Sequence, residues 1–342
     1  MKGLAWYDKF IFFFNFLFAS ALLVGYLLPY IPPKTFALVS VLSLGVPLLI
    51  IVNLIFLVYW ILRLKKQVLL SLVVLLLGFN HVTSVFEFSG DDEEVVSEDL
   101  TLMSYNVRQF NWYGWDAQKN VPQKISAFIK KQDPDIITMQ EYFKGELTIA
   151  ERFPHKYIKQ KNESAEFGLA ILSKYPIINT QNLDFQTASN NNGIFADIVI
   201  KEDTLRIFNV HFQSYSMKPD LQKLEEEHSK KVFLGMGRTF VKQQEQMEIV
   251  MEHIKNSPYK VILMGDFNNT AYSYIYREFT SVGLDDAYKD DGFGFGRTFD
   301  FDYFPLRIDY ILVDEELKIN SFETMEVHYS DHFPIKATIN LN

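Results

Sequence analysis

The segment Val261-Ile-Leu-Met-Gly-Asp-Phe-Asn268 decides the fold prediction, because an apolar run leads directly into a polar turn. A short apolar run before a glycine favours a buried β-strand, so the polar residues lie at the end of that strand. The same pattern recurs along the chain, with carboxylates, amides and imidazoles at or beside apolar strands. These residues are Asn106, Glu141, His211, Asp266, Asn268, Asp309, Asp331 and His332. One such residue alone would be structural, but eight in the same placement predict a single polar pocket at a sheet edge.

Working outward, strands are more numerous than helices in the rest of the soluble region. Strands are predicted over 100–105, 136–139, 168–172, 194–200, 205–210, 261–264, 308–313 and 335–339, and helices over 121–131 and 238–255. Hairpins mixed with crossovers favour an α+β or mixed layered domain over a Rossmann fold. Neither a GxGxxG motif after a strand nor a GxxxxGK[ST] motif occurs. The chain has no cysteine, which excludes disulfides, thiolate catalysis and cysteine-ligated zinc.

Seven segments carry a family resemblance. They are LMSYNVR (102–108), PDIITMQE (134–141), GLAILSKYPI (168–177), IFNVHF (207–212), VILMGDFN (261–268), RIDYIL (307–312) and YSDHFP (329–334). Together they resemble the endonuclease/exonuclease/phosphatase superfamily, the DNase I-like group, over about residues 100–342. The resemblance implies an α/β (α+β) four-layer sandwich, in which two mixed β-sheets are flanked by helices.

The resemblance also implies a metal site. Glu141 would bind a divalent cation, Mg²⁺ or Mn²⁺ in its place, and Asn106 and Asp331 would support that site directly or through water. Oxygen ligands of this kind suit a hard cation that keeps several waters and contacts phosphate.

The remaining polar residues would carry the chemistry of water attack on a phosphorus ester, with the metal as Lewis acid. Asp309 would pair with His332 and favour its charged form. Asp266 would orient or deprotonate the attacking water, and the sequence leaves open whether Asp266 or His332 is the general base. Asn268 would hold developing negative charge, and His211 would donate to a non-bridging oxygen.

The first ninety residues differ from the rest in composition. Apolar runs over 10–28, 36–62 and 68–85 are each long enough for a membrane helix, so residues 1–89 are predicted to form a membrane domain with three transmembrane helices. A cleaved signal peptide is the alternative for the first run, which is longer than a signal h-region and is followed by two more. Residues 90–99 are predicted to be an acidic linker, and 100–342 the catalytic domain.

Basic side chains set the predicted orientation. They precede the first apolar run and separate the second from the third, which favours a cytoplasmic N-terminus. These residues are Lys2, Lys9, Arg63, Lys65 and Lys66, with Lys34 as a contrary signal. The catalytic domain is therefore predicted to lie outside the cytoplasm, on a multi-pass protein of the inner membrane.

Charge and anchoring guide the substrate prediction. Residues 1–89 have a net charge of +4, so the remainder carries −13 of the total of −9, which weakens the case for nucleic acid. Anchoring raises the local concentration of lipid head groups. A phospholipid or sphingolipid head group is therefore the favoured substrate. An extracytoplasmic nuclease is the alternative, and a non-catalytic membrane scaffold the second alternative. The bilayer is the predicted partner, and no protein partner is predicted.

Four more residues are candidates for substrate binding. Trp112, Tyr113 and Trp115 follow Asn106 closely and suit stacking on a base or sugar, or a membrane interface, with core packing as the alternative. Arg307 suits a phosphate contact or a structural ion pair. The segment 214–239 mixes charges with an apolar stretch and is interpreted as a mobile flap.

Overall fold

A computed structural model describes residues 4–88, 90, 99–115, 117–145, 148–160, 164–185, 191–215, 226–301 and 305–341, with the backbone alone for 226–229. Most of the predicted acidic linker and residues 216–225 of the predicted flap lie outside these ranges.

Two six-stranded sheets form the centre of the soluble region. The first has the order β13-β14-β2-β3-β5-β4, and the second β10-β12-β9-β8-β7-β6. The first sheet comprises β2 (Leu100–Asn106), β3 (Ile136–Phe143), β4 (His155–Gln160), β5 (Phe167–Ser173), β13 (Lys318–Thr324) and β14 (Ile335–Asn340). The second comprises β6 (Ile177–Asn182), β7 (Asn192–Ile200), β8 (Asp203–His211), β9 (Lys260–Asp266), β10 (Leu284–Asp286) and β12 (Asp309–Asp314). Both sheets are mixed, because β2 runs parallel to β3 and β8 parallel to β9.

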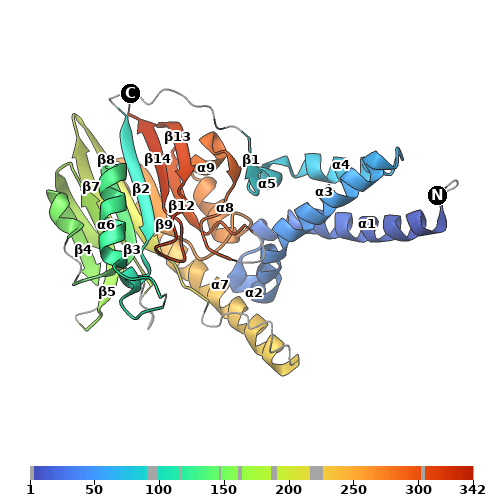
Figure 1. Ribbon diagram of the computed structural model, residues 1–342, viewed down its shortest axis with the longest axis horizontal. Coiled ribbons are helices and arrows are strands. Elements are labelled where there is room, and N and C mark those ends of the chain that lie inside the picture. Colours follow the sequence, from blue (N-terminus) through green and yellow to red (C-terminus); the bar gives the residue numbers. More distant parts are fainter. Residues whose placement is uncertain are drawn as a thin grey trace.

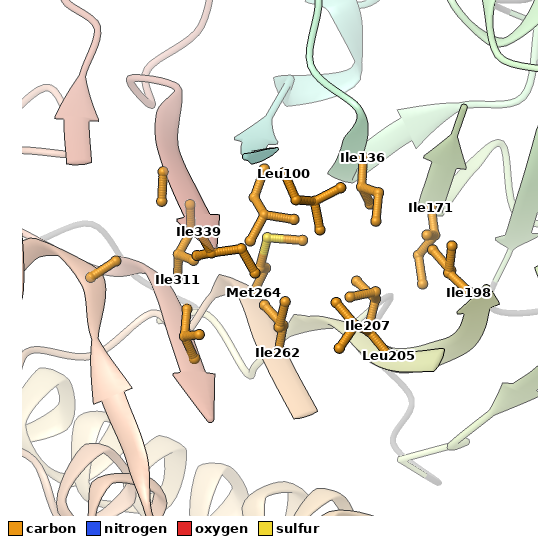
Figure 2. Packing of buried hydrophobic residues seen from close by; sticks show 14 of the residues in the cluster. Leu100, Ile136, Ile171, Ile198, Leu205, Ile207, Ile262, Met264, Ile311 and Ile339 are labelled. Carbon is orange, nitrogen blue, oxygen red and sulfur yellow. The ribbon is translucent and has the colours of Figure 1, made fainter. Parts of the chain in front are cut away.

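The two sheets pack face to face through aliphatic side chains. Leu100, Ile171, Ile207 and Met264 belong to this inner core (Figure 2). Alternation along the strands explains the layers: on β2, Leu100 and Leu102 face the inner core, while Met103 and Tyr105 belong to the outer cluster.

Helices cover both outer faces. The helix α6 (Val121–Gln132) packs on the first sheet, and α7 (Glu226–Lys255) and α8 (Tyr274–Thr280) pack on the second. Short elements fill the connections: η3 (Arg108–Asn111), η4 (Ala150–Arg152), α9 (Ala287–Asp291) and the two-stranded sheet of β1 (Phe86–Glu87) and β11 (Gly294–Phe295). The prediction of two mixed sheets flanked by helices is confirmed.

The N-terminal region is helical and extends away from the sheets (Figure 1). It comprises α1 (Trp6–Gly25), η1 (Leu28–Tyr30), α2 (Pro33–Val41), η2 (Leu42–Gly45), α3 (Val46–Leu62), α4 (Val68–Leu77) and α5 (Phe79–Val82). Two helical stretches, Trp6–Tyr30 and Pro33–Leu62, are long and apolar enough to cross a membrane.

The prediction of a third helix of that length, over 68–85, is wrong. The apolar helix α4 has ten residues and stops at Gly78, after which α5 begins. A side chain at Gly78 would collide with the Tyr26 ring, since a Cβ there would lie 2.0 Å from its Cζ. Close packing of Tyr26 therefore requires glycine at this point, where the helix is interrupted. The helix α4 nevertheless packs alongside α1, because Asn15 of α1 donates a hydrogen bond to Ser71 of α4 at 2.8 Å.

Several contacts join the helical bundle to the rest of the chain. The His81 ring lies between Tyr26 and Tyr272, with centroid distances of 4.8 and 5.9 Å. The Tyr272 hydroxyl donates to the His81 carbonyl at 2.8 Å. The pairing of Phe86 with Phe295 adds a short ribbon. The bundle is therefore packed against the loop that precedes α8 and against the short strand β11.

The helix α7 is longer than predicted. It begins at Glu226, so the second half of the predicted flap is helical. Gly235 and Gly237 lower helix propensity, which hides this part of the helix from the sequence pattern. A Cβ at Gly237 would lie 3.0 Å from Leu38 of α2, so the glycine permits close packing of the two helices.

Candidate functional site

Four polar residues form one row across the second sheet. Strand register pairs Asp309 of β12 with Asp266 of β9, Asp266 with His211 of β8, and His211 with Asn192 of β7. Directly paired residues share one face of a sheet, so the row follows from register alone. Asn192 was missed by the sequence analysis, because the register of β7 against β8 is known only from the structure.

Asp266 lies at the centre of the site. Its Oδ2 accepts from Asn106 Nδ2 at 3.0 Å and its Oδ1 from the Asn268 backbone N–H at 2.8 Å. The Nε2 atoms of His211 and His332 lie 3.5 and 3.7 Å from Oδ2. Burial raises the pKa of Asp266 to about 7, against the opposing charge of His332. A carboxylate with this pKa is suited to accept a proton near neutral pH.

His332 is held by Asp309. Its Nδ1 lies 2.9 and 3.1 Å from the two Asp309 carboxylate oxygens. The Thr298 hydroxyl fixes the start of β12 by accepting from the backbone N–H of Asp309 at 3.0 Å. Burial alone would lower the pKa of His332, but the carboxylates of Asp309 and Asp266 outweigh it and raise the pKa to about 10. His332 is therefore an imidazolium at neutral pH.

Asp266, Asp309 and His332 have ligand atoms within 4.8 Å of one another, the spacing of a metal site. His332 Nδ1 is held by Asp309, and the Asp266 carboxylate accepts from Asn106 and Asn268. We interpret this trio as an acid–base cluster.

The two pKa values predict a bell-shaped pH dependence of kcat/KM. Activity is expected to rise as Asp266 loses its proton near pH 7 and to fall as His332 loses its proton near pH 10. Asp309→Asn removes a charge that holds the His332 proton, so the alkaline limb should move down by about one pH unit or more. Asp314→Asn at the other end of β12 is the control. An alkaline limb that stays in place in Asp309→Asn would contradict this assignment.

Glu141 adopts a left-handed backbone conformation with φ +52° at a register shift in β3. Gln109 Nε2 donates to its Oε2 at 2.8 Å. Burial raises the pKa of Glu141, while the His332 charge lowers it and Asp331 raises it further.

The residues around Glu141 fit a divalent cation by donor chemistry. Glu141 and Asp331 offer carboxylate oxygens, and Asn106 offers its amide oxygen, which accepts from the Arg108 backbone N–H at 3.1 Å. Arg108 Nε pairs with Asp331 at 3.1 Å. A hard cation favours such an all-oxygen set, and burial of the Glu141 charge is the cost that a cation would offset.

His211 and Asn268 complete the set. Burial, with a smaller effect of the His332 charge, lowers the pKa of His211 to about 3, so this imidazole is neutral and carries one N–H donor. Asn268 has φ +49°, and its Nδ2 donates to the Phe212 carbonyl at 3.0 Å. That bond orients the amide and uses one of its two N–H groups.

The predicted aromatic residues are on the surface. Four successive residues, 108–111, have positive φ, which turns the chain outward after Asn106. Trp112, Tyr113 and Trp115 are 63, 54 and 57% exposed, so the core-packing alternative is wrong for all three. Trp112 stacks on Phe143 at 4.2 Å between centroids.

Arg307 is buried and forms the ion pair that the sequence left open as an alternative. Its Nη1 donates to both Asp286 oxygens, at 2.9 and 2.7 Å. The guanidinium also lies over the Tyr288 and Tyr310 rings, 4.4 and 4.7 Å from their centroids. No contact places it against the catalytic cluster within the described residues.

Arg307→Met is expected to lower the free energy of unfolding by about 3–5 kcal/mol, because the Asp286 carboxylate would stay buried without its cation. Thermal denaturation of the full chain in detergent measures the loss, and Arg307→Met/Asp286→Leu should recover part of it. A raised KM with unchanged thermal stability would instead show that Arg307 contacts substrate.

Buried glutamine and asparagine side chains support the site and were not found from the sequence. Gln243 Nε2 donates to the carbonyls of Gln213 and Asn268 at 2.8 and 3.1 Å, and its Oε1 accepts from Asn269 at 2.7 Å. Between the sheets, Gln140 donates to Asn209 at 2.8 Å. Asn209 is a polar residue within an otherwise apolar strand, and this pattern could have identified it from the sequence. Gln243 lies on a helix where no such pattern occurs.

Comparison with known proteins places this geometry in context. A model described as the endonuclease/exonuclease/phosphatase family matches residues 103–332, and one described as a domain of unknown function (DUF8431) matches residues 8–85. A search of curated proteins finds no match.

Three solved structures illustrate the similarity of fold. The endonuclease/exonuclease/phosphatase of Beutenbergia cavernae DSM 12333 is 15% identical with a TM-score of 0.53, covering 72% of each chain. TDP2 of D. rerio, complexed with a single strand DNA product, is 16% identical with a TM-score of 0.53, covering 71% of this chain and 100% of that one. A mannosyl-6-phosphatase of Bacteroides thetaiotaomicron VPI-5482 is 20% identical with a TM-score of 0.51, at the same coverages. These identities show a shared fold alone.

Proposed function

Because the chain belongs to the endonuclease/exonuclease/phosphatase family, whose members are metal-dependent phosphoester hydrolases, we propose that it is a membrane-anchored phosphoesterase. The catalytic region is 100–342 and the membrane region 1–89. The observation that carries the proposal is the buried cluster of Asp266, Asp309 and His332. Burying three ionisable groups together costs stability, which a site with no chemistry would have no reason to retain.

In the proposed reaction, water attacks the phosphorus of a phosphoester. Asp266 orients that water and takes its proton, since its pKa lies near 7. His332 is already protonated, so it serves as the cationic partner of the phosphoryl oxygens rather than as the base. Asp309 keeps His332 charged and oriented. Asn268 and neutral His211 donate N–H groups to the developing negative charge.

Glu141 would hold the cation, Mg²⁺ or Mn²⁺, with Asn106 and Asp331 in support. The cation would supply Lewis-acid polarisation of the phosphoryl group. Gln109 and Arg108 orient the two carboxylates through the contacts described above.

We favour a phospholipid or sphingolipid head group as substrate. The support is the position of the two helical stretches that suit a membrane. Both contact the catalytic region: the Arg277 guanidinium lies over the Tyr30 ring, and the Lys34 backbone N–H donates to Gln244. A head group at the bilayer surface would then meet the site at high local concentration.

Anchored nuclease activity is the second candidate. One observation favours it: Trp112, Tyr113 and Trp115 form an exposed aromatic surface on the turn that follows Asn106. Aromatic faces of this kind stack on bases with little sequence preference. A non-catalytic scaffold is the third candidate, and the buried acid–base cluster argues against it.

The substrate test uses the full chain in phosphatidylcholine nanodiscs with Mg²⁺, and His332→Ala as the blank. Sphingomyelin and phosphatidylinositol vesicles are offered in parallel with plasmid DNA. Release of a head group or phosphate, absent from the blank, supports the lipid substrate. Nicking of DNA alone supports the nuclease. Activity on neither, in preparations that bind metal, argues for the scaffold.

The proposed orientation has a cytoplasmic N-terminus and an extracytoplasmic catalytic region on the inner membrane. It requires the interrupted segment of α4 and α5 to make the third crossing. Figure 1 shows α1 extending away from the sheets, with its start at the remote end of the bundle. The Arg63–Asp8 ion pair, at 3.1 Å, brings the basic connection after α3 to the start of α1. Both segments then lie on one side, as the distribution of basic residues predicts.

The absence of cysteine makes this orientation testable with single substitutions. In intact spheroplasts, an impermeant maleimide should label Lys255→Cys in the catalytic region. Lys65→Cys should be labelled only after permeabilisation. The opposite pattern would reverse the orientation, and labelling of both before permeabilisation would reject a membrane crossing between them.

A further inference from the structure

A cavity of about 140 Å³ lies between α7 and the chain that follows β8. Its lining residues come from one face of α7 and from the loop after His211: Gln213, Tyr215, Val232, Gly235, Met236, Arg238, Thr239 and Lys242. One water needs about 10–15 Å³, so the cavity has room for a small polyatomic group. None of the chemistry assigned above uses it.

Two cationic side chains and one buried hydroxyl group line the cavity. Arg238 and Lys242 are exposed, and neither forms an ion pair with any residue that the structure describes. They are four residues apart on the helix, where like charges face and repel each other. The Tyr215 hydroxyl is buried and has no hydrogen-bond partner among the described residues, which is costly for a polar group. A bound anion would relieve both effects.

The cavity adjoins the catalytic cluster. Gln213 lies two residues after His211, and its backbone N–H donates to Gln246 of α7 at 2.8 Å. The Phe212 N–H donates to the Asp266 carbonyl at 2.9 Å. Burial and the charge of Asp266 both raise the pKa of Tyr215, which places this hydroxyl within electrostatic reach of Asp266. A group in the cavity and a group at Asp266 can therefore belong to one molecule.

The opposite face of α7 contacts α2 of the membrane region. Gly237, Gln244 and Glu248 recur at helical spacing and face α2. Gln244 Oε1 accepts from the Lys34 backbone N–H at 2.8 Å, and Lys34 Nζ pairs with Glu248. The width of α7, about 10–12 Å, therefore separates the cavity from α2, where the apolar stretch begins at Pro33.

We propose that this cavity is an anion subsite that binds a phosphate group of the substrate, beside the ester that is hydrolysed. Arg238 and Lys242 supply the charge, and the Tyr215 hydroxyl donates a hydrogen bond. The inference deepens the proposed function, because it states what the substrate carries besides the scissile bond. Either a phospholipid in the adjacent bilayer or a soluble phosphate ester would present this group.

The test measures binding without turnover. Inorganic phosphate is titrated by calorimetry into the full chain in phosphatidylcholine nanodiscs with EDTA, which removes metal from the catalytic centre. Arg238→Gln/Lys242→Gln is expected to weaken phosphate binding at least about tenfold, and Tyr215→Phe to weaken it by a smaller factor. Lys130→Gln/Lys255→Gln, which removes two exposed charges elsewhere, is the matched control.

Equal binding by Arg238→Gln/Lys242→Gln and the unaltered protein would overturn the subsite. Loss of binding in the matched control as well would also overturn it, because net charge would then explain the effect. Two competitors distinguish the sources of the phosphate group. If replacing a tenth of the phosphatidylcholine by phosphatidic acid abolishes the binding of inorganic phosphate, the group belongs to a lipid. If only added glycerol 1-phosphate abolishes it, the group belongs to a soluble ester. A protein that binds phosphate through these residues but hydrolyses nothing would keep the subsite and reject the phosphoesterase.

Discussion

Asp266→Asn is expected to lower kcat about 10³–10⁴-fold, the range for loss of an acid–base group together with orientation of the attacking water. The asparagine keeps the volume but cannot take a proton at neutral pH. It also loses one of the two acceptors that now bind Asn106 and the Asn268 N–H. Initial rates at saturating substrate measure the effect.

A buried aspartate elsewhere provides the control for Asp266→Asn. Asp197 pairs with Arg206 at 2.7 Å on the second sheet, away from the row of polar residues. Asp197→Asn should lower thermal stability while the folded protein keeps its kcat. A kcat for Asp266→Asn within tenfold of the unaltered enzyme would remove this residue from the mechanism.

Removal of divalent metal is the second change with a large expected effect. Excess EDTA should abolish hydrolysis, and added Mg²⁺ or Mn²⁺ should restore it, because the cluster alone cannot neutralise the phosphoryl charge. Glu141→Gln should raise the metal concentration for half-maximal rate more than about a hundredfold, since loss of a mere supporting contact costs 10–100-fold.

Glu166→Gln is the control for Glu141→Gln, because Glu166 is exposed and pairs only with Lys144 among the described residues. Its metal dependence should match that of the unaltered enzyme. Full turnover in excess EDTA would show that the reaction needs no metal.

The sequence predicted the strand ends well, for a physical reason. Apolar runs such as 261–264 have to be buried, and the polar residues that end them gather at one edge when the strands pair. Asp266, Asp309 and His211 therefore lie in one row of the second sheet. The sequence could not supply the register that also brings Asn192 into this row.

The errors arose where tertiary packing overrides local pattern. Gly78 interrupts the third apolar run because the Tyr26 ring occupies the space of a side chain. In the sequence, Gly237 predicts a break in the helix. In the structure it lies inside α7, where close contact with Leu38 favours glycine. Gln243 is buried and donates hydrogen bonds to two separate loops. No periodic pattern in the sequence predicts that a glutamine on a helix is buried in this way.

The stacking of His81 on Tyr272 and the ribbon of Phe86 with Phe295 leave little room for hinge motion between bundle and sheets. In the proposed membrane enzyme, the catalytic centre would then work at one fixed height above the lipid plane instead of swinging on a tether. Such an enzyme finds its targets by lateral diffusion, a two-dimensional search. Target choice would depend on how far a phosphoester projects from the bilayer, as well as on its chemistry.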